Sequence, residues 1–135
     1  MPYPSKAEIQ ERAASLATDD NTPFFSRVSP NVVWDVMGTH PAAGRFTNLE
    51  DWKKGALGVV NKILSEPLKL KVVNVVGGGD EWATLELEAN ATCKNGMAYP
   101  QRYAWVLRFD EDGTVVQARA YLDSALVQKA VDGNS

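Results

Sequence analysis

The sequence contains only one cysteine, Cys93, and only one histidine, His40, among its 135 residues. A single cysteine cannot form an intrachain disulfide, and it cannot supply a cluster of thiolate ligands. One histidine adds too few nitrogen ligands to complete a zinc-type centre. We therefore expect no metal site, and we interpret Cys93 as a small hydrophobic residue of the interior.

Long apolar runs and an excess of basic residues are also absent. No segment approaches the roughly 20 apolar residues that span a bilayer, and residues 1–10 lack the basic and apolar regions of a signal peptide. The formal net charge is −3 and the pI is about 5.1, so the basic stripe of a nucleic-acid-binding protein is missing. These absences predict a cytoplasmic protein without a membrane or nucleic-acid partner.

The first half of the sequence carries helix signals. The whole sequence has 135 residues, which suits one domain with one core. Its composition, with 44% hydrophobic and 23% charged residues, is ordinary for a globular protein. Ser5 and Glu8 form a capping box, and Thr22 before Pro23 starts a second, short helix expected to run through Val28. Residues 47–50 form another capping box, which begins an amphipathic helix expected to end at Pro67.

In the second half of the sequence, apolar and polar residues alternate with a period of two, which is typical of strands. Strands are predicted over residues 68–76, 83–92, 99–109 and 114–122, after an earlier short strand over 32–37. The run 72–76 breaks the alternation and predicts either a bulge or burial on both faces, while Asn95-Gly96 predicts a hairpin. A short helix should follow Asp123. This order predicts an α+β fold in which helices pack on one face of a curved antiparallel sheet and leave a conical cavity.

Two segments resemble a known superfamily. Residues 33–44 resemble the ketosteroid isomerase segment that holds the catalytic base and a G-x-x-P-x-x-G loop, and residues 107–113 with 120–122 resemble the closing hairpin of the same proteins. The chain thus resembles the SnoaL-like and ketosteroid isomerase-like members of the nuclear transport factor 2-like superfamily. The resemblance implies a single SnoaL-like domain over residues 1–135 with a cystatin-like α+β barrel. It also implies a homodimer formed through the outer sheet face.

The resemblance places Asp35 at the position of the isomerase's general base. Asp35 either faces a partly dry cavity, where burial makes its proton harder to remove, or is an ordinary solvated strand residue. His40 either moves protons and contacts ligand from its Gly/Pro loop, or is a solvent-exposed loop residue. Together with Tyr103 these residues are the predicted catalytic set. The isomerase's two oxyanion donors are not matched, because residues 12–16 hold no tyrosine where it has one on its first helix, and Trp105 stands at the position of its donor aspartate.

The predicted ligand contacts come mainly from one face of the predicted strand 99–109. The aromatic residues of this face either line a ligand site or fill a packed core. Alternation turns Glu86 and Glu88 outward, whereas spacing against the isomerase turns them inward. Asp123 matches a catalytic position in some SnoaL-like cyclases and also suits a helix N-cap. The predicted ligand-binding residues are Trp34, Trp52, Glu86, Glu88, Tyr99, Gln101, Trp105, Leu122 and Asp123.

These features favour an enzyme that works without a cofactor. It would bind a small apolar or polycyclic molecule in the cone and move a proton during isomerisation, cyclisation, dehydration or epoxide opening. The alternative is a non-catalytic small-molecule-binding or dimerisation module, which the missing oxyanion donors favour. The pKa of Asp35 separates the two hypotheses, because a catalytic carboxyl in a dry cavity would have a raised pKa.

Overall fold

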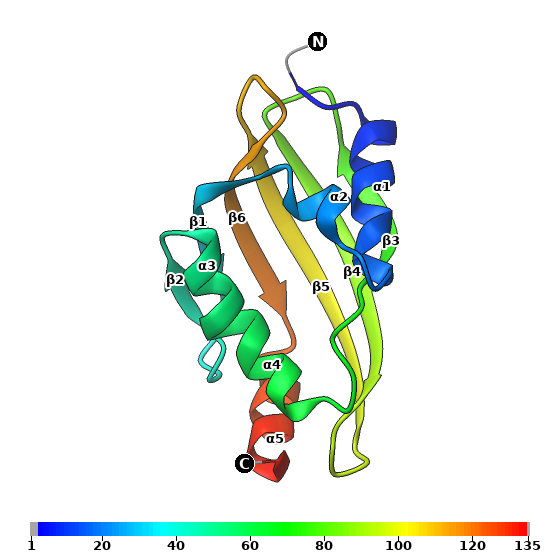
Figure 1. The fold of residues 1–135 in the computed structure, drawn as a ribbon, viewed down its shortest axis with the longest axis vertical. Helices are drawn as coiled ribbons and strands as arrows, with labels where there is room; N and C mark the ends of the chain where they lie inside the picture. Colours follow the sequence, from blue (N-terminus) through cyan, green and yellow to red (C-terminus); the bar gives the residue numbers. More distant parts are fainter. Residues whose placement is uncertain (1–2, 135) are drawn as a thin grey trace.

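The computed structural model describes residues 3–134, which form a six-stranded sheet with the order β2-β1-β6-β5-β4-β3 (Figure 1). Neighbouring strands are antiparallel except for β1 and β6, which run parallel. The predicted α+β class is therefore confirmed, with one parallel pair inside the sheet. The strands are β1 (Val28–Val36), β2 (Gly44–Phe46), β3 (Lys71–Gly77), β4 (Trp82–Thr92), β5 (Ala98–Phe109) and β6 (Val115–Leu122).

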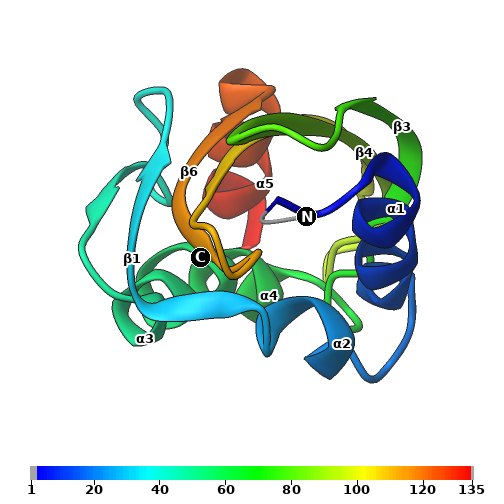
Figure 2. The ribbon, with the colours of Figure 1, turned by 90° about the horizontal axis from the view of Figure 1, so that it is seen from above.

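The helices lie on the concave side of this sheet. Seen from above, the sheet curves around an interior that α1, α2, α3 and α4 close from the other side (Figure 2). The C-terminal helix α5 packs against α4 and β5 at one end of the molecule. The helical elements are α1 (Lys6–Ala14), the 3-10 turn η1 (Ser15–Ala17), α2 (Thr22–Phe25), α3 (Leu49–Trp52), the π-helical turn η2 (Lys53–Leu57), α4 (Gly58–Ile63) and α5 (Ser124–Asn134).

The first helix begins as predicted, and the second is shorter than predicted. The Ser5 hydroxyl accepts the Glu8 N–H at 3.1 Å, and the Glu8 carboxylate accepts the Ser5 N–H at 3.0 Å, which completes the capping box. Helix α2 ends at Phe25, because the Arg27 carbonyl already accepts the Val115 N–H of β6. Pairing with β6 thus starts the first strand at Val28, earlier than the alternation indicated.

The central helix follows the predicted apolar stripe but contains a π-helical turn. Its N-cap is Asn48 rather than Thr47, because the Asn48 side chain accepts the Asp51 N–H at 2.8 Å. Within η2 the Gly58 N–H donates to the Lys53 carbonyl, one residue further back than in an α-helix. This helical segment ends at Ile63, short of the proline that was expected to stop it. The π turn had no signal in the sequence.

Along the long strands, successive side chains point alternately to the concave face and to the outer face of the sheet. Every second residue of β5 from Tyr99 to Phe109 is buried on the concave side, as predicted. The register between β3 and β4 shifts between Val72 and Asn74, which confirms the predicted bulge. Gly96 has a φ of 87°, so the hairpin between β4 and β5 uses the backbone freedom of glycine. The concave face of β5 is consequently formed by five aromatic or aliphatic side chains and one amide, Gln101.

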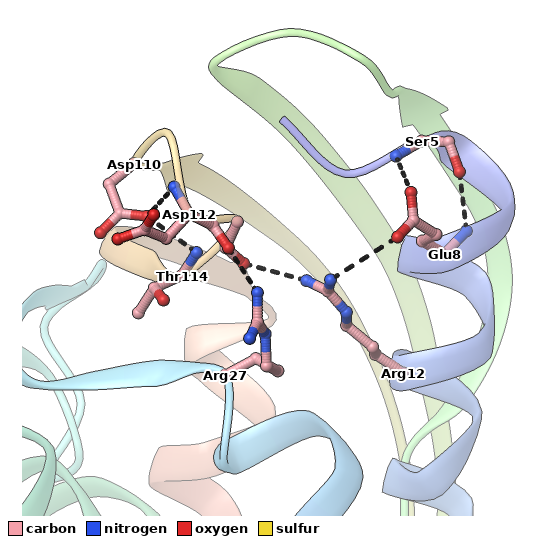
Figure 3. Close-up of polar contacts among 8 residues, drawn as sticks. Ser5, Glu8, Arg12, Arg27, Asp110, Asp112 and Thr114 are labelled. Atoms are coloured by element: carbon pink, nitrogen blue, oxygen red, sulfur yellow. Dashed lines mark hydrogen bonds and ion pairs between the residues drawn. The ribbon is translucent and has the colours of Figure 1, made fainter. Parts of the chain in front are cut away.

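Two arginines close the end of the cone opposite to α5 (Figure 3). Arg12 donates to the Gly113 carbonyl at 2.9 Å, and Arg27 donates to the neighbouring Asp112 carbonyl. A side chain on Gly113 would come within 3.0 Å of the Arg27 guanidinium, and the φ of Gly113 is 80°. Glycine therefore lets both arginines reach the β5–β6 turn. They fasten this turn to α1 and to the start of β1.

Candidate functional site

A cavity lies between the concave face of the sheet and the helical segment α3–η2–α4. The space measures about 410 Å³ when the open solvent at its mouth is included, so its enclosed part is much smaller. β1, β5 and β6 supply one wall and the helices the other. The lining residues are Val36, His40, Ala42, Trp52, Ala56, Leu57, Val60, Leu68, Tyr103, Trp105, Ala120 and Leu122.

The walls of this cavity are apolar and carry no formal charge. None of the described residues that line it is an aspartate, glutamate, lysine or arginine. Leu57, Leu68 and Leu122 are half-buried, and the other lining residues are buried. A ligand here loses its hydration, so each polar group on the walls has a large effect on which ligands bind.

His40 lines the cavity with both ring nitrogens already engaged. Its Nδ1 accepts the Ala42 N–H at 3.2 Å, and its Nε2 lies 3.0 Å from the Met37 carbonyl. Because the Ala42 N–H can only donate and a carbonyl can only accept, this network assigns the proton to Nε2 and leaves the ring neutral. Burial lowers the pKa of His40, which is only 5% exposed. This burial excludes one of the two alternatives for His40, that of a solvent-exposed loop residue.

Tyr103 is the polar residue of the cavity wall without a partner. Its side chain is 9% exposed, and its hydroxyl is buried with no hydrogen-bond partner among the described residues. Burial raises the pKa of Tyr103 well above 10.0, and interaction with the neighbouring Tyr99 hydroxyl raises it further. Tyr103 thus keeps its proton at neutral pH and can donate a hydrogen bond.

Three tryptophans form the aromatic side of the site. Trp34 stacks on Trp52 with ring centroids 3.9 Å apart, and Trp105 meets Trp34 edge to face at 5.1 Å. Trp52 and Trp105 line the cavity as predicted, whereas Trp34 packs behind Trp52 and does not line it. The predicted aromatic face is thus partly ligand wall and partly packed core.

Three further predicted ligand residues join β5 to α5 instead of lining the cavity. The Gln101 amide donates to the Asp123 carbonyl at 3.1 Å, and its oxygen accepts the Asp123 N–H at 2.8 Å. The Asp123 carboxylate accepts the Leu126 N–H at 3.1 Å, so Asp123 is the N-cap of α5. Tyr99 lies beside Gln101, with its hydroxyl 3.5 Å from the amide nitrogen. Tyr99, Gln101 and Asp123 therefore hold the end of the cone together.

The orientation expected for Asp35 is corrected by the structure. Trp34 and Val36 point into the interior, so the alternation of β1 turns Asp35 to the outer face of the sheet. There the Arg45 guanidinium donates to both carboxylate oxygens, at 2.7 and 3.0 Å. This ion pair lowers the pKa of Asp35, and Arg119 nearby lowers it further. Asp35 is thus a charged outer-face residue and not a carboxyl that retains its proton inside a dry cavity.

Glu86 and Glu88 also lie on the outer face, which corrects their prediction as ligand-binding residues. Leu85 and Leu87 fill the interior between them. The Glu86 carboxylate accepts the Asn74 side-chain N–H at 2.9 Å on the adjacent strand. Hydrophobic alternation therefore decided this orientation, and the spacing taken from the resemblance did not.

Most of the small aliphatic lining residues were not predicted from the sequence. A signal existed for Ala56 and Val60, because they share the predicted apolar stripe with Trp52. Ala120 pairs with Trp105 across β5 and β6, so it follows once the register is known. Leu68 precedes β3 in an extended segment, and no sequence pattern assigned it to the cavity.

The described part of the chain shows neither a metal-binding cluster nor a membrane-spanning helix. Within residues 3–134, no three His, Cys, Asp or Glu side chains are placed to hold a metal ion. Over the same range, every helix is too short or too polar to cross a bilayer. The chemistry available at the cavity is accordingly that of Tyr103, His40 and the indole rings.

Comparison with known proteins gives two curated relatives among fungal enzymes. The chain is 32% identical over 134 residues to the dimerizing cyclase phiC of a fungal species, and the match covers 98% of this chain and 59% of that protein. It is 27% identical over 124 residues to the dimerizing cyclase tstC of Talaromyces stipitatus, covering 90% of this chain and 55% of that protein. The chain thus spans between half and two thirds of the length of these relatives. No protein-family model matches it.

The fold is shared with solved structures of low sequence identity. A nuclear transport factor 2-like protein from Burkholderia thailandensis superposes with a TM-score of 0.77 at 17% identity, and the match covers 94% of this chain and 96% of that one. The chain therefore has the nuclear transport factor 2-like fold, which confirms the fold that the resemblance implied.

Proposed function

We propose that this chain, with its nuclear transport factor 2-like fold, is a small-molecule enzyme of the cyclase or isomerase type. The observation that carries the proposal is the apolar cavity, at whose wall the Tyr103 hydroxyl is buried without a partner. Likeness to two dimerizing cyclases over 98% and 90% of the chain supports ring closure as the reaction class. The substrate binds between Tyr103 and the helical wall.

The first contribution of this site to catalysis is orientation. An apolar enclosure holds a flexible substrate in a reactive pose and keeps water from the reacting atoms. The second contribution is a hydrogen bond from the Tyr103 hydroxyl to a substrate oxygen that gains negative charge in the transition state. Loss of one such donor typically lowers a rate by roughly 10²–10³-fold.

His40 acts as a positioning residue in this proposal. Its two hydrogen bonds hold residues 37–42 in place beside the cavity. It could accept a proton on Nδ1 only by releasing the Ala42 N–H, which would then be buried without an acceptor. Asp35 takes no part in the reaction, because its carboxylate lies on the outer face with Arg45.

A second candidate function is that of a binding module without catalysis. It is favoured by the missing general base: no carboxylate is among the described lining residues, and both His40 nitrogens are occupied. Such a module would use the same cavity for the same kind of ligand. The two functions differ only in whether a bound molecule reacts.

Deuterium exchange on a simple ketone separates these functions. We would incubate 1-tetralone with the protein in D₂O and follow the loss of the signal of its α-protons by NMR. In this reaction the α C–H bond breaks, its electron pair forms the enolate whose charge lies on oxygen, solvent base takes the proton, and a deuteron from solvent returns to carbon. An enzyme with a donor to that oxygen accelerates this exchange.

Tyr103→Phe should remove most of the acceleration, since the variant keeps the ring and loses only the donor. Tyr121→Phe is the matched control, because Tyr121 is 44% exposed on the outer face. Exchange by the wild-type protein no faster than in buffer would contradict the proposed enzyme and leave the binding module.

We further propose that the protein forms a homodimer through the outer sheet face. Trp82 is 37% exposed there, and the Arg119 guanidinium packs on its ring at 4.7 Å. An exposed tryptophan held by a cation is a typical component of an interface. Light scattering on the purified chain should give twice the mass of one chain, and a single-chain mass at tens of micromolar would contradict the dimer.

A further inference from the structure

We infer that residues 38–43 form a lid on the cavity, which the His40 ring holds closed while the ring is neutral and releases when it takes up a proton. The lid is the connection of the hairpin between β1 and β2. Its opening and closure control access to the cavity. The inference rests on the proposed function in taking the cavity as the substrate site, and it holds whether or not a bound molecule reacts.

The lid has an inner and an outer side. His40 and Ala42 line the cavity and are 5% and 2% exposed, whereas Gly38, Thr39 and Pro41 are exposed to solvent. The same short segment therefore separates the cavity from bulk water on this side. Movement of the lid would open the cavity there.

Two glycines with a left-handed backbone bound the lid. The φ angles of Gly38 and Gly44 are 111° and 141°, in the region that L side chains rarely adopt. A side chain on Gly38 would collide with Ser124 at the start of α5, whereas one on Gly44 would meet no atom of residues 3–134 within 4 Å. Gly38 thus seats the closed lid against α5, and Gly44 leaves its other end room to turn. Such positions absorb the backbone rotation of a hinge.

The His40 ring is the brace of the closed lid. Its Nε2 donates to the Met37 carbonyl at 3.0 Å, just before the lid, and its Nδ1 accepts the Ala42 N–H at 3.2 Å, near the lid's other end. The backbone adds a bond from the Ala43 N–H to the His40 carbonyl at 3.0 Å. One ring therefore connects the two ends of the lid, and the closed conformation depends on Nδ1 as an acceptor.

A proton on Nδ1 breaks this brace. Nδ1 then carries a hydrogen, so it faces the Ala42 N–H donor to donor, and that N–H loses its acceptor. The new positive charge also lies in a wall whose described residues carry no formal charge. Both costs end when the lid moves into water, because water accepts from both donors and hydrates the ring. The open lid is therefore the conformation that takes up the proton.

The charged groups on the elements around His40 are engaged elsewhere. On β1, Asp35 lies on the outer face with Arg45, and Asp123 caps α5. The described part of the helical wall presents neither a carboxylate nor a cation to the cavity, and Tyr103 of β5 keeps its proton. Burial lowers the pKa of His40 from 6.5. The lid is consequently closed at neutral pH and opens on the acidic side of 6.5.

Two measurements on the free protein test the lid without a ligand. The first is amide exchange by NMR, which gives the protection factor of the Ala42 N–H relative to an unstructured peptide at the same pH. Uptake of a proton by an open ring of pKa 6.5 favours the open lid by up to about 30-fold between pH 7.5 and pH 5.0. We expect Ala42 protection to fall by about 10- to 30-fold over this range. The reference is the Leu70 N–H, which donates to the Leu16 carbonyl at 2.9 Å and should keep its protection.

The second measurement is the quenching of interior tryptophan fluorescence by acrylamide, which is uncharged at both pH values and quenches on contact. It uses Trp82→Phe, because Trp82 is 37% exposed and would be quenched whether the lid is open or closed. The remaining signal comes from Trp34, Trp52 and Trp105, and the last two line the cavity. We expect the quenching constant to rise severalfold from pH 7.5 to pH 5.0.

His40→Gln is the matched control. The glutamine amide supplies a donor and an acceptor but does not titrate in this range, so both readouts should become independent of pH. His40 is the only histidine of the chain, so the variant removes every imidazole. The comparison of Ala42 with Leu70 in the wild type decides the matter even where the variant is unstable.

Several results would overturn the inference. These are a change in Ala42 protection of less than about threefold, an equal loss at Leu70, which would indicate loosening of the whole fold, or constant quenching while Ala42 loses protection. A pH effect that persists in His40→Gln would overturn it as well. Absence of deuterium exchange on 1-tetralone would leave the lid standing and contradict only the proposed enzyme.

Discussion

The two faces of the sheet are built from the same strands and have opposite chemistry. The concave face carries Tyr103, Trp105 and the apolar residues of the cavity, without a formal charge among the described lining residues. The outer face carries ion pairs, such as Asp35 with Arg45 and Glu81 with Arg108. A period of two along each strand produces this division, since neighbouring residues point to opposite faces.

This comparison shows where the chemistry of the molecule can lie. Asp35, Glu86 and Glu88, three of the carboxylates that looked most useful in the sequence, are on strands, and alternation sends them outward, where Asp35 pairs with Arg45 and Glu86 with Asn74. Among the described residues that line the cavity, the polar groups besides the indoles are the Tyr103 hydroxyl and the ring of His40, whose nitrogens are both occupied. In the proposed enzyme, the concave face would therefore act through hydrogen-bond donation and orientation rather than through a charged base.

The largest effect should come from removing aromatic volume on the concave side. Trp34→Ala deletes a fully buried ring that stacks on Trp52 at 3.9 Å, and we expect it to lower the free energy of unfolding by about 3–5 kcal/mol. Trp82→Ala removes the same residue type from the outer face, where it is partly exposed, and should have less than half this effect. Urea unfolding of both variants measures the difference.

Both variants should be compared at a protein concentration at which light scattering shows single chains, so that assembly does not add to stability. Equal losses for Trp34→Ala and Trp82→Ala would mean that the two faces do not differ in packing as the structure indicates.

A pH dependence should distinguish the buried histidine from the outer-face carboxylate. Burial lowers the pKa of His40 below its ordinary value of 6.5 in the folded chain, so between the two values the unfolded chain binds more protons. The free energy of unfolding should then fall as the pH falls through the window just below 6.5, and His40 should add no slope above it. Asp35 has its pKa lowered from 3.8, so its contribution is lost only at more acidic pH.

Urea unfolding between pH 5 and 7.5 measures the slope, and His40→Gln is the variant that should abolish it. The variant removes the titrating ring, so its stability should be flat across this window even if its overall value is lower. A wild-type chain whose stability does not change between pH 7 and pH 5 would contradict the neutral, buried state of His40.

Much of the fold could be predicted from local signals. The capping box of α1, the hairpin at Asn95-Gly96, the bulge near Val72 and the buried face of β5 each depend on a few neighbouring residues. The parallel pairing of β1 with β6 and the short strand β2 could not be predicted in this way, because they depend on contacts between distant segments. The π turn η2 likewise had no local signal.

The site was predicted in part, and the errors at Asp35, Glu86 and Glu88 have one physical origin. His40, Tyr103, Trp52, Trp105 and Leu122 do line the cavity. Asp35 was assigned by resemblance to a segment, yet a shift of one residue along a strand reverses the face on which a side chain lies. The alternation of Trp34 and Val36 around it held the information on its orientation.

The smallest effect should come from Asp35→Asn, which tests the outer face directly. The variant keeps the shape of the side chain and removes the charge that pairs with Arg45; the Arg45 side chain is 66% exposed and that of Asp35 is 14% exposed. We expect deuterium exchange to change less than about twofold, and stability to fall by no more than about 1 kcal/mol, because Arg45, the group left without its partner, stays solvated. A general base at this position would instead lower the exchange rate by roughly 10²-fold or more when neutralised. Such a loss, with the stability unchanged, would mean that Asp35 reaches a substrate from the outer face and that the division between the two faces does not govern the chemistry.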